Sequence, residues 1–207
     1  ISDEHLSKIM REITHPNHTA LIEYNHDIYQ KLVNYLSVEQ DLGKGRKGQT
    51  VKIIDFDNPA NNDFLCTSQF KIEGVNQNII PDIICFVNGL PLAVLELKSP
   101  KAENADIWDA FNQIQTYKDE VSDLFVYNEA LVVSDGYTAR VGSLTANQER
   151  FMPWRTIKHE DDKPLLEWQL ETMVRGFFDR EMLLDYIRYF VLFETDADKL
   201  IKKIAGY

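Results

Sequence analysis

Two carboxylates and a lysine lie close together in the sequence, around a short apolar hairpin. Glu96 and Lys98 are two positions apart within the apolar run 92–98, and Asp82 follows Pro81 just before the apolar run 83–87. Residues two apart on a strand project from the same face of a sheet. Charges on an apolar strand are costly unless they are paired or bind a metal. The pattern therefore predicts either a metal site or a plain Glu–Lys ion pair.

The chemistry that fits these residue types is metal-assisted hydrolysis of a phosphodiester. The carboxylates of Asp82 and Glu96, with the carbonyl between Glu96 and Lys98, offer the hard oxygen ligands that Mg²⁺ prefers. A bound Mg²⁺ lowers the pKa of a water molecule and neutralises phosphate charge. The Lys98 ammonium has no lone pair for a metal, so it would orient the attacking water or stabilise developing negative charge.

A second polar pair follows on a predicted helix. Gln113 and Tyr117 are four positions apart, so they share a helix face that can look back at the strand ends. Their amide and phenol groups suit hydrogen bonds to a phosphate, a water molecule or the lysine. The alternative is an amphipathic helix that carries two unremarkable polar residues.

The elements that would position these residues follow from the spacing of apolar side chains. That spacing predicts helices over 20–36 and about 104–120, and strands at 51–55, 64–72, 83–87, 92–98, 130–134 and 139–142. Strands interleaved with helices indicate an α/β fold, with a mixed sheet flanked by helices. After a linker around 155–164 the pattern is all helical, with a break at Gly176.

The hairpin between 83–87 and 92–98 sets a geometric condition on the site. Asn88-Gly89 is the strongest sequence signal for a two-residue turn. A regular hairpin on that turn places Asp82 opposite Leu95, on the face away from Glu96. A three-residue loop, or a bulge on either strand, shifts the register by one residue and restores a shared face. The metal site therefore requires an odd-membered loop or a bulge.

Composition restricts the class of protein. The 207 residues are 44% hydrophobic and 27% charged, as in ordinary globular proteins. Cys66 and Cys85 lie in apolar runs and are expected to be buried free thiols in a reducing compartment. No apolar run approaches the roughly 20 residues of a membrane span, and the N-terminus lacks a signal-peptide pattern. A cytoplasmic location is expected.

The formal net charge of −11 is unusual for a nucleic-acid-binding chain, because phosphate contacts from Lys and Arg supply much of such affinity. The dense basic cluster at 44–47 is expected to be a solvated turn. The charge balance predicts that this chain alone binds DNA weakly, and that metal ions or other polypeptides provide the missing positive charge.

Separated motifs, found in a fixed order, resemble the N-terminal nuclease domain of the restriction subunit of type I restriction–modification enzymes. They are the segment 61–70, Pro81-Asp82 with Glu96-Leu97-Lys98, the segment 110–117 and the segment 133–136. The likeness covers most of residues 20–155. It implies a PD-(D/E)xK restriction-endonuclease-like fold, Mg²⁺ as cofactor, and cleavage of double-stranded DNA coupled to ATP-driven translocation. It also implies methyltransferase and specificity subunits as partners.

The resemblance assigns roles to individual residues. Asp82 and Glu96 resemble the metal-binding carboxylates, Lys98 the catalytic lysine, and Gln113 with Tyr117 a Gln-x-x-x-Tyr motif. Some members of the family add an acid from the N-terminal helix, for which Glu23 is the candidate.

The same resemblance divides the chain. Residues 1–155 are expected to form the endonuclease domain, and 164–207 a helical linker that leads toward a translocase. These residues contain no Gly-x-x-x-x-Gly-Lys-Ser/Thr phosphate loop, so ATP hydrolysis is expected outside them. Two alternatives remain open: a degenerate nuclease fold that only docks partner subunits, and a stand-alone nuclease or resolvase with the same site.

Overall fold

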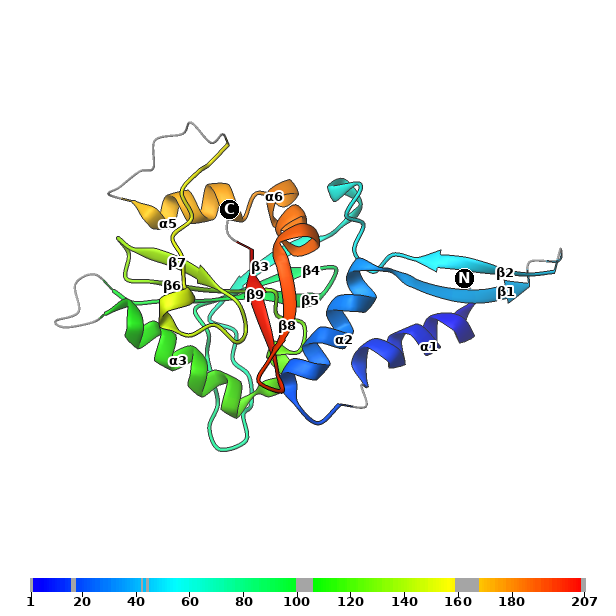
Figure 1. The fold of residues 1–207 in the computed structure, drawn as a ribbon, viewed down its shortest axis with the longest axis horizontal. Coiled ribbons are helices and arrows are strands. Elements are labelled where there is room, and N and C mark those ends of the chain that lie inside the picture. Colours follow the sequence, from blue (N-terminus) through cyan, green and yellow to red (C-terminus); the bar gives the residue numbers. More distant parts are fainter. Residues whose placement is uncertain are drawn as a thin grey trace.

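A five-stranded mixed sheet lies at the centre of the molecule (Figure 1). The computed structural model describes residues 2–15, 18–41, 43, 45–99, 106–158 and 168–205. The strands stand in the order β3-β4-β5-β6-β7, and their bounds are β3 (Phe64–Ser68), β4 (Ile83–Val87), β5 (Leu90–Leu97), β6 (Ala130–Ser134) and β7 (Ala139–Gly142). β5 and β6 pair in parallel and the other neighbours are antiparallel. The predicted mixed α/β architecture is confirmed, and β4, β6 and β7 have the predicted bounds.

Helices cover both faces of this sheet. α3 (Ile107–Glu120) and the short α4 (Ser122–Phe125) pack on one face, and α2 (Leu21–Val33) packs mainly on the other. α3 begins at a capping box in which Asp106 and Asp109 each accept a backbone N–H of the first turn. Its buried residues recur at three- and four-residue steps: Ile107, Ala110, Ile114 and Tyr117. This spacing fixes the face of α3 that looks at the sheet.

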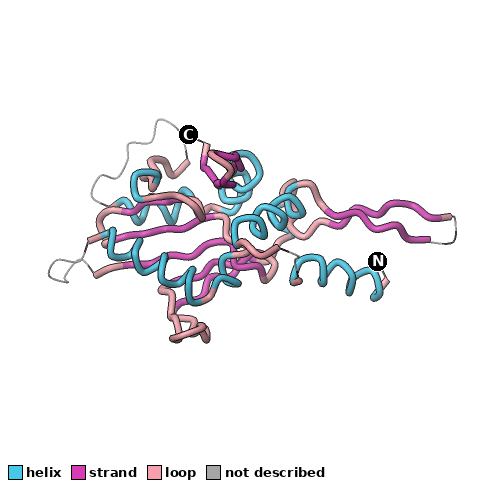
Figure 2. Tube along the Cα trace, turned by 60° about the horizontal axis from the view of Figure 1, so that its bottom comes forward, coloured by secondary structure: helices cyan, strands magenta, loops and turns pink. Residues whose placement is uncertain are grey.

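The N-terminal part differs from the prediction in two places. α1 (Asp3–Thr14) precedes α2, and β1 (Leu36–Asp41) pairs with β2 (Arg46–Val51) in a hairpin that projects from the body (Figure 2). The predicted helix over 20–36 ends at Val33, and the predicted strand at 51–55 is wrong because pairing stops at Val51. Arg46 and Lys47 start β2, so the basic cluster is a strand end rather than a turn; Lys44 lies outside the described residues.

The C-terminal part is helical only in its first half. α5 (Gln169–Thr172) continues as a π-helical turn over Met173–Phe177, and α6 (Arg180–Asp185) continues as another over Tyr186–Phe190. A hairpin follows, β8 (Val191–Asp196) with β9 (Lys199–Ile204), so the all-helical prediction is wrong. The helix runs through Gly176 to Phe177; a Cβ at Gly176 would lie 2.1 Å from the Thr156 carbonyl, so close packing requires the glycine.

Two short 3₁₀ turns complete the described structure, at Pro59–Asn61 and Gln148–Arg150. No helix in the described ranges is long and apolar enough to cross a membrane.

A buried ion pair joins β9 to the start of β6. Lys202 and Glu129 are both fully buried, and the ammonium of Lys202 donates to a Glu129 carboxylate oxygen, to Asn25 Oδ1 at 3.0 Å and to the Asn128 carbonyl at 2.7 Å. All three ammonium protons therefore have acceptors. Removing one partner of such a pair leaves an uncompensated charge in the interior.

We expect Lys202→Ala to lower the free energy of unfolding by about 3–5 kcal/mol, as is usual when one partner of a buried ion pair is deleted. The double variant Lys202→Met/Glu129→Leu should recover most of this loss, because no lone charge stays buried. Urea unfolding measures both. Lys203→Met, which breaks an exposed pair with Glu194, is the control and should cost less than about 1 kcal/mol. If Lys202→Ala lowered the free energy of unfolding by no more than the control does, the buried Lys202–Glu129 ion pair would be contradicted.

The two cysteines face each other across β3 and β4. Cys85 is buried as predicted, but Cys66 is exposed, which corrects the expectation of two buried thiols. Hydrogen bonds from Gln69 N to the Asp82 carbonyl and from Asn88 N to the Asp63 carbonyl mark the hydrogen-bonded pairs of this ladder. Alternation makes Cys66–Cys85 a non-hydrogen-bonded pair, where Cα atoms stand about 4.5 Å apart. That spacing lies within the range that a disulfide spans.

Mild oxidation with a small-molecule disulfide should therefore convert the two thiols into a bond between β3 and β4. The protein should lose two hydrogen atoms by intact mass and melt at a higher temperature, because the cross-link restricts the unfolded chain. Cys66→Ser should show neither change. Persistence of two titratable thiols in the oxidised wild type would contradict the expected proximity.

Candidate active site

The connection between β4 and β5 meets the condition that the site requires. Asn88 and Gly89 both have positive φ, 51° and 82°, and they form a two-residue turn that pairs Val87 with Leu90. The register then shifts, since Phe86 pairs with Pro91 but Cys85 pairs with Ala93. Leu92 is the extra residue of a β-bulge. Ile83 pairs with Leu95 beyond the bulge, so the register continues to Asp82 opposite Glu96. The predicted bulge is confirmed, and the three-residue loop is not used.

The Asp82 carboxylate is held from two sides. Its Oδ2 accepts the backbone N–H of Leu97 at 2.8 Å, and its Oδ1 accepts from the Gln69 side-chain amide at 3.2 Å. The first of these hydrogen bonds crosses to β5 between Glu96 and Lys98. The side chain of Asp82 therefore reaches the strand segment that carries the other two residues.

Glu96 and Lys98 form the ion pair that the simpler interpretation predicted. Lys98 Nζ lies 3.0 Å from Glu96 Oε1, and the Glu96 side chain is only 3% exposed. The pair is nevertheless more than a surface salt bridge. Glu96 Oε2 accepts from the Tyr117 hydroxyl at 3.2 Å, and the Lys98 ammonium also donates to Gln113 Oε1. Helix α3 thus contacts both members of the pair.

Gln113 and Tyr117 bind each other as well as the strand residues. The Gln113 amide N–H donates to the Tyr117 hydroxyl oxygen, and the hydroxyl also lies 3.4 Å from the Ile80 carbonyl. Four side chains therefore form one hydrogen-bonded network: Glu96, Lys98, Gln113 and Tyr117. The helix orients the lysine and the buried carboxylate together, while Lys98 stays partly exposed and can be reached from solvent.

Burial raises the pKa of Glu96, and the negative charge of Asp82 raises it further, while Lys98 and Tyr117 oppose the shift. The interactions with Lys98 and Tyr117 therefore do not fully offset the cost of burying the Glu96 charge beside Asp82. Burial and the charge of Glu96 also raise the pKa of Tyr117, to about 12, so its hydroxyl stays protonated and can donate. A perturbed carboxylate beside a second one is common at functional sites.

The donor set fits a hard divalent cation. Asp82 and Glu96 present two carboxylates whose charges repel, and a cation between them would relieve that repulsion. The described residues contain no cluster of three or more His, Cys, Asp or Glu side chains that could hold an ion. A metal at this place would therefore need backbone oxygen, water or substrate oxygen to complete its coordination, as Mg²⁺ sites commonly do.

Comparison with known proteins agrees with these motifs. The family described as type I restriction enzyme R protein N terminus matches residues 2–150. The endonuclease subunit of the HindI type I restriction enzyme from Haemophilus influenzae is 43% identical over 206 residues, which cover 98% of this chain and 20% of the relative. The EcoprrI endonuclease subunit from Escherichia coli is 27% identical over 159 residues, 75% of this chain and 50% of the relative.

The chain belongs to the type I restriction enzyme R protein N-terminal family. It spans about a fifth of the length of the Haemophilus influenzae relative. The match over 2–150 includes β3 to β7 and all five residues that the sequence analysis grouped around the hairpin and α3.

Glu23, the further acid suggested for this family, lies apart from the network. Its carboxylate is 54% exposed and stands 4.0 Å from the His18 ring. The Asn25 side chain, two residues on, donates to the carbonyls of Phe125, Val126 and Asn128, which precede the start of β6. Glu96, in contrast, pairs late in β6. The described contacts thus place Glu23 toward the opposite end of the strands.

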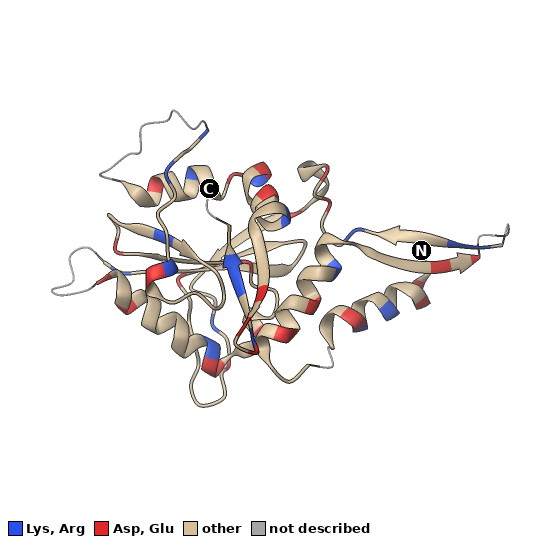
Figure 3. Cartoon of the chain, viewed as in Figure 1, with Lys and Arg blue, Asp and Glu red and all other residues tan. Residues whose placement is uncertain are grey.

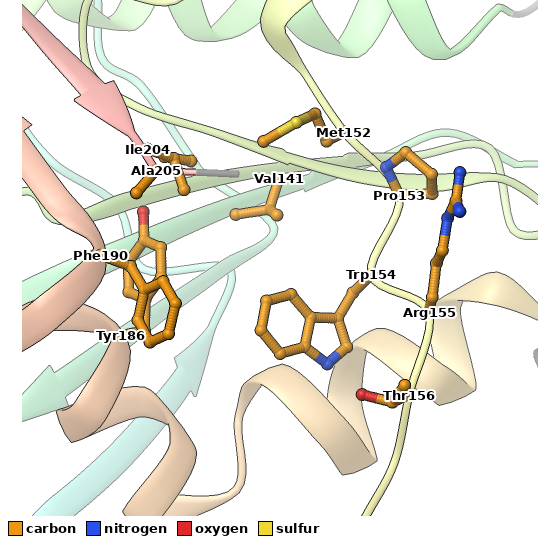
Figure 4. A pocket seen from close by; sticks show the side chains of 10 residues that line it. All are labelled: Val141, Met152, Pro153, Trp154, Arg155, Thr156, Tyr186, Phe190, Ile204 and Ala205. Atoms are coloured by element: carbon orange, nitrogen blue, oxygen red, sulfur yellow. The ribbon is translucent and has the colours of Figure 1, made fainter. Parts of the chain in front are cut away.

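A cavity of about 260 Å³ also lies outside the network. Its walls come from β7, the segment 152–156, both ends of the second π-helical turn and the end of β9, with Val141, Trp154 and Tyr186 among them (Figure 4). None of the five predicted site residues lines it. This cavity and the titratable site are therefore different places in this R protein domain.

Sequence analysis missed the roles of two residues, one beside the site and one in the turn at the far end of the β4–β5 hairpin. Gln69 contacts Asp82 directly, although it was noted only as part of a motif. Asn88 was assigned to the turn alone, yet its side chain bonds Asp63 N at 2.7 Å, the Ile53 carbonyl at 2.7 Å and Asn62 at 2.9 Å. These bonds fix the hairpin tip to the preceding loop. A polar residue in an Asn-Gly turn gives no sequence signal for such a role.

In the metal-free protein we expect Glu96→Gln to raise the melting temperature at neutral pH. The folded-state pKa of Glu96 is raised, so its stabilising contribution is present below the unfolded pKa and lost as pH rises through the folded pKa. Glutamine mimics the protonated acid, so the gain should shrink as the pH is lowered. Thermal melts in a chelator at neutral and acidic pH measure this. Glu149→Gln, at an exposed site, is the control and should leave the melting temperature unchanged. A Glu96→Gln variant that melts below the wild type at neutral pH would contradict the unfavourable burial of the Glu96 charge beside Asp82.

Proposed function

We propose that this chain is a Mg²⁺-dependent endonuclease domain that hydrolyses phosphodiester bonds of double-stranded DNA within a type I restriction enzyme. The observation that carries the proposal is the buried Glu96 carboxylate, which lies opposite Asp82 and is bonded to Lys98 and Tyr117. The type I R protein family membership supports the same chemistry. ATP-driven translocation would belong to parts of such a subunit outside these residues, and methyltransferase and specificity subunits would be its partners.

Each residue has a distinct role in this proposal. Asp82 and Glu96 hold Mg²⁺, which when bound activates water and offsets charge on the phosphate. Lys98 aims its ammonium group toward the site and stabilises negative charge on the attacking or phosphate oxygens. Gln113 and Tyr117 fix the position of Lys98 and Glu96 through the α3 network. The arrangement is built before substrate arrives, which is what makes electrostatic stabilisation effective.

A docking module with a degenerate nuclease fold is the competing function. Its support is the net charge of −11, which is unfavourable for DNA binding by this chain alone. Figure 3 shows acidic and basic residues interspersed along the helices and the β1–β2 hairpin. A docking module, however, gains nothing from a carboxylate whose pKa is raised by burial and by the charge of a second carboxylate. Such an arrangement costs stability, and sites that cost stability usually serve chemistry. The nuclease function is therefore favoured.

The decisive experiment is plasmid cleavage by the assembled restriction enzyme with ATP and Mg²⁺. Lys98→Ala should lower the cleavage rate by roughly 10²–10³-fold, as expected for loss of one group that stabilises transition-state charge. ATP hydrolysis by the same complex should be unchanged. The reason is that, among the described residues, the Lys98 ammonium donates to Glu96 and Gln113 of this site, whereas ATP hydrolysis is assigned to parts of the subunit outside these residues.

Lys71→Ala is the matched control, because Lys71 is an exposed lysine on the loop after β3. It should cleave like the wild type. If the Lys98→Ala complex linearises plasmid at the control rate, the site is not catalytic and the docking function is favoured instead.

A further inference from the structure

Gln69 adopts a backbone conformation that its residue type rarely takes. It follows the last residue of β3 and has φ of 55°, in the left-handed region. Glycine and asparagine occupy this region readily, whereas a side chain such as glutamine is strained there. Strain of this kind persists where the surrounding structure requires a particular side chain at that point.

The side chain and backbone of Gln69 both bind Asp82. Gln69 N donates to the Asp82 carbonyl at 3.1 Å, and Gln69 Nε2 donates to Asp82 Oδ1 at 3.2 Å. Leu97 N occupies the other carboxylate oxygen at 2.8 Å. Among the described residues, each oxygen of Asp82 thus accepts one hydrogen bond from a neutral donor. A carboxylate oxygen has two lone pairs, so one on each oxygen stays available to a cation.

The donors to Asp82 are neutral. No Lys, Arg or His within the described ranges forms an ion pair with it, whereas Glu96 is paired with Lys98. An amide orients a carboxylate without cancelling its charge, but an ammonium or guanidinium group would compete with a metal for it. The described donors around Asp82 therefore orient its carboxylate without a cationic side chain that would compete with a metal for it.

We propose that Gln69 is a positioning residue that holds the Asp82 carboxylate in the orientation in which it binds the divalent metal. The proposal rests on the nuclease function proposed above. Groups that orient a metal ligand typically contribute about 10–100-fold to metal affinity. The competing explanation is that the left-handed conformation of Gln69 serves only to turn the chain away from β3.

Two substitutions separate these explanations. Gln69→Gly keeps the left-handed backbone without strain but removes the amide, and Gln69→Met keeps the length of the side chain but removes the donor. Ala197→Gly is the matched control, because Ala197 also has positive φ, 45°, in the β8–β9 turn. Binding of Mn²⁺ alone to the purified protein, followed by the electron paramagnetic resonance signal of the free ion, gives the affinity. Thermal melts in a chelator show that each variant is folded.

We expect Gln69→Gly and Gln69→Met to bind Mn²⁺ about tenfold or more weakly than the wild type. Gln69→Gly should melt at or above the wild-type temperature, as Ala197→Gly should, while Ala197→Gly binds Mn²⁺ normally. In the assembled enzyme the Gln69 variants should need more Mg²⁺ for half-maximal cleavage and approach the wild-type rate at saturation. A role confined to the chain turn would leave the Mg²⁺ dependence unchanged.

Glu96→Gln distinguishes failure of this proposal from failure of the nuclease function. If the wild type binds Mn²⁺, Glu96→Gln does not, and both Gln69 variants bind like the wild type, the positioning role is overturned and the metal site stands. If the wild type binds no more Mn²⁺ than Glu96→Gln does, the metal site itself fails, and the role of Gln69 fails with it. Wild-type affinity in Gln69→Met alone would also overturn the role, because methionine cannot donate to Asp82.

Discussion

The register between β4 and β5 is the constraint on which the candidate site depends. Side chains alternate between the faces of a strand, so a shift of one residue moves every side chain to the other face. The bulge at Leu92 supplies that shift, and it sets Asp82 opposite Glu96. Pro91 stands beside the extra residue, where its missing N–H costs the ladder least. A single inserted position thus decides whether two carboxylates meet.

The same register extends across the whole sheet. Gln69 pairs with Asp82, the register of β5 continues to Glu96, Glu96 pairs with Val133, and Val133 pairs with Arg140. Glu96 and Val133 are buried within this row, and Gln69 at its edge is exposed. Helix α3 lies over the row and binds Glu96 through Tyr117. The acid is therefore buried by the packing that also orients it, and its raised pKa follows from that packing.

The spacing of apolar residues predicted those helices and strands whose conformation is determined by their own sequence. Short apolar runs gave β4, β6 and β7, and three- and four-residue spacing gave α3. The pattern failed where two states compete: Leu36 continues the helical spacing of α2, yet Tyr35 with φ of 62° turns the chain into β1. At 191–204 the apolar residues also fit a helix, and only pairing between β8 and β9 settles the outcome. The five grouped residues were predictable from type and spacing, but Gln69 was not, because its contact depends on a left-handed backbone.

Residues 168–205 pack against the α/β part and share its core. Met173, Phe177 and Val191 pack in the same apolar cluster as Ile28 and Leu32 of α2, beneath the sheet strands. Lys202 adds a charge whose acceptors all come from residues before 130. Burying that ammonium is favourable only while those acceptors surround it. Residues 168–205 therefore complete the core of the described structure, and a boundary at 155 would leave Glu129 and the apolar face of α2 exposed to water.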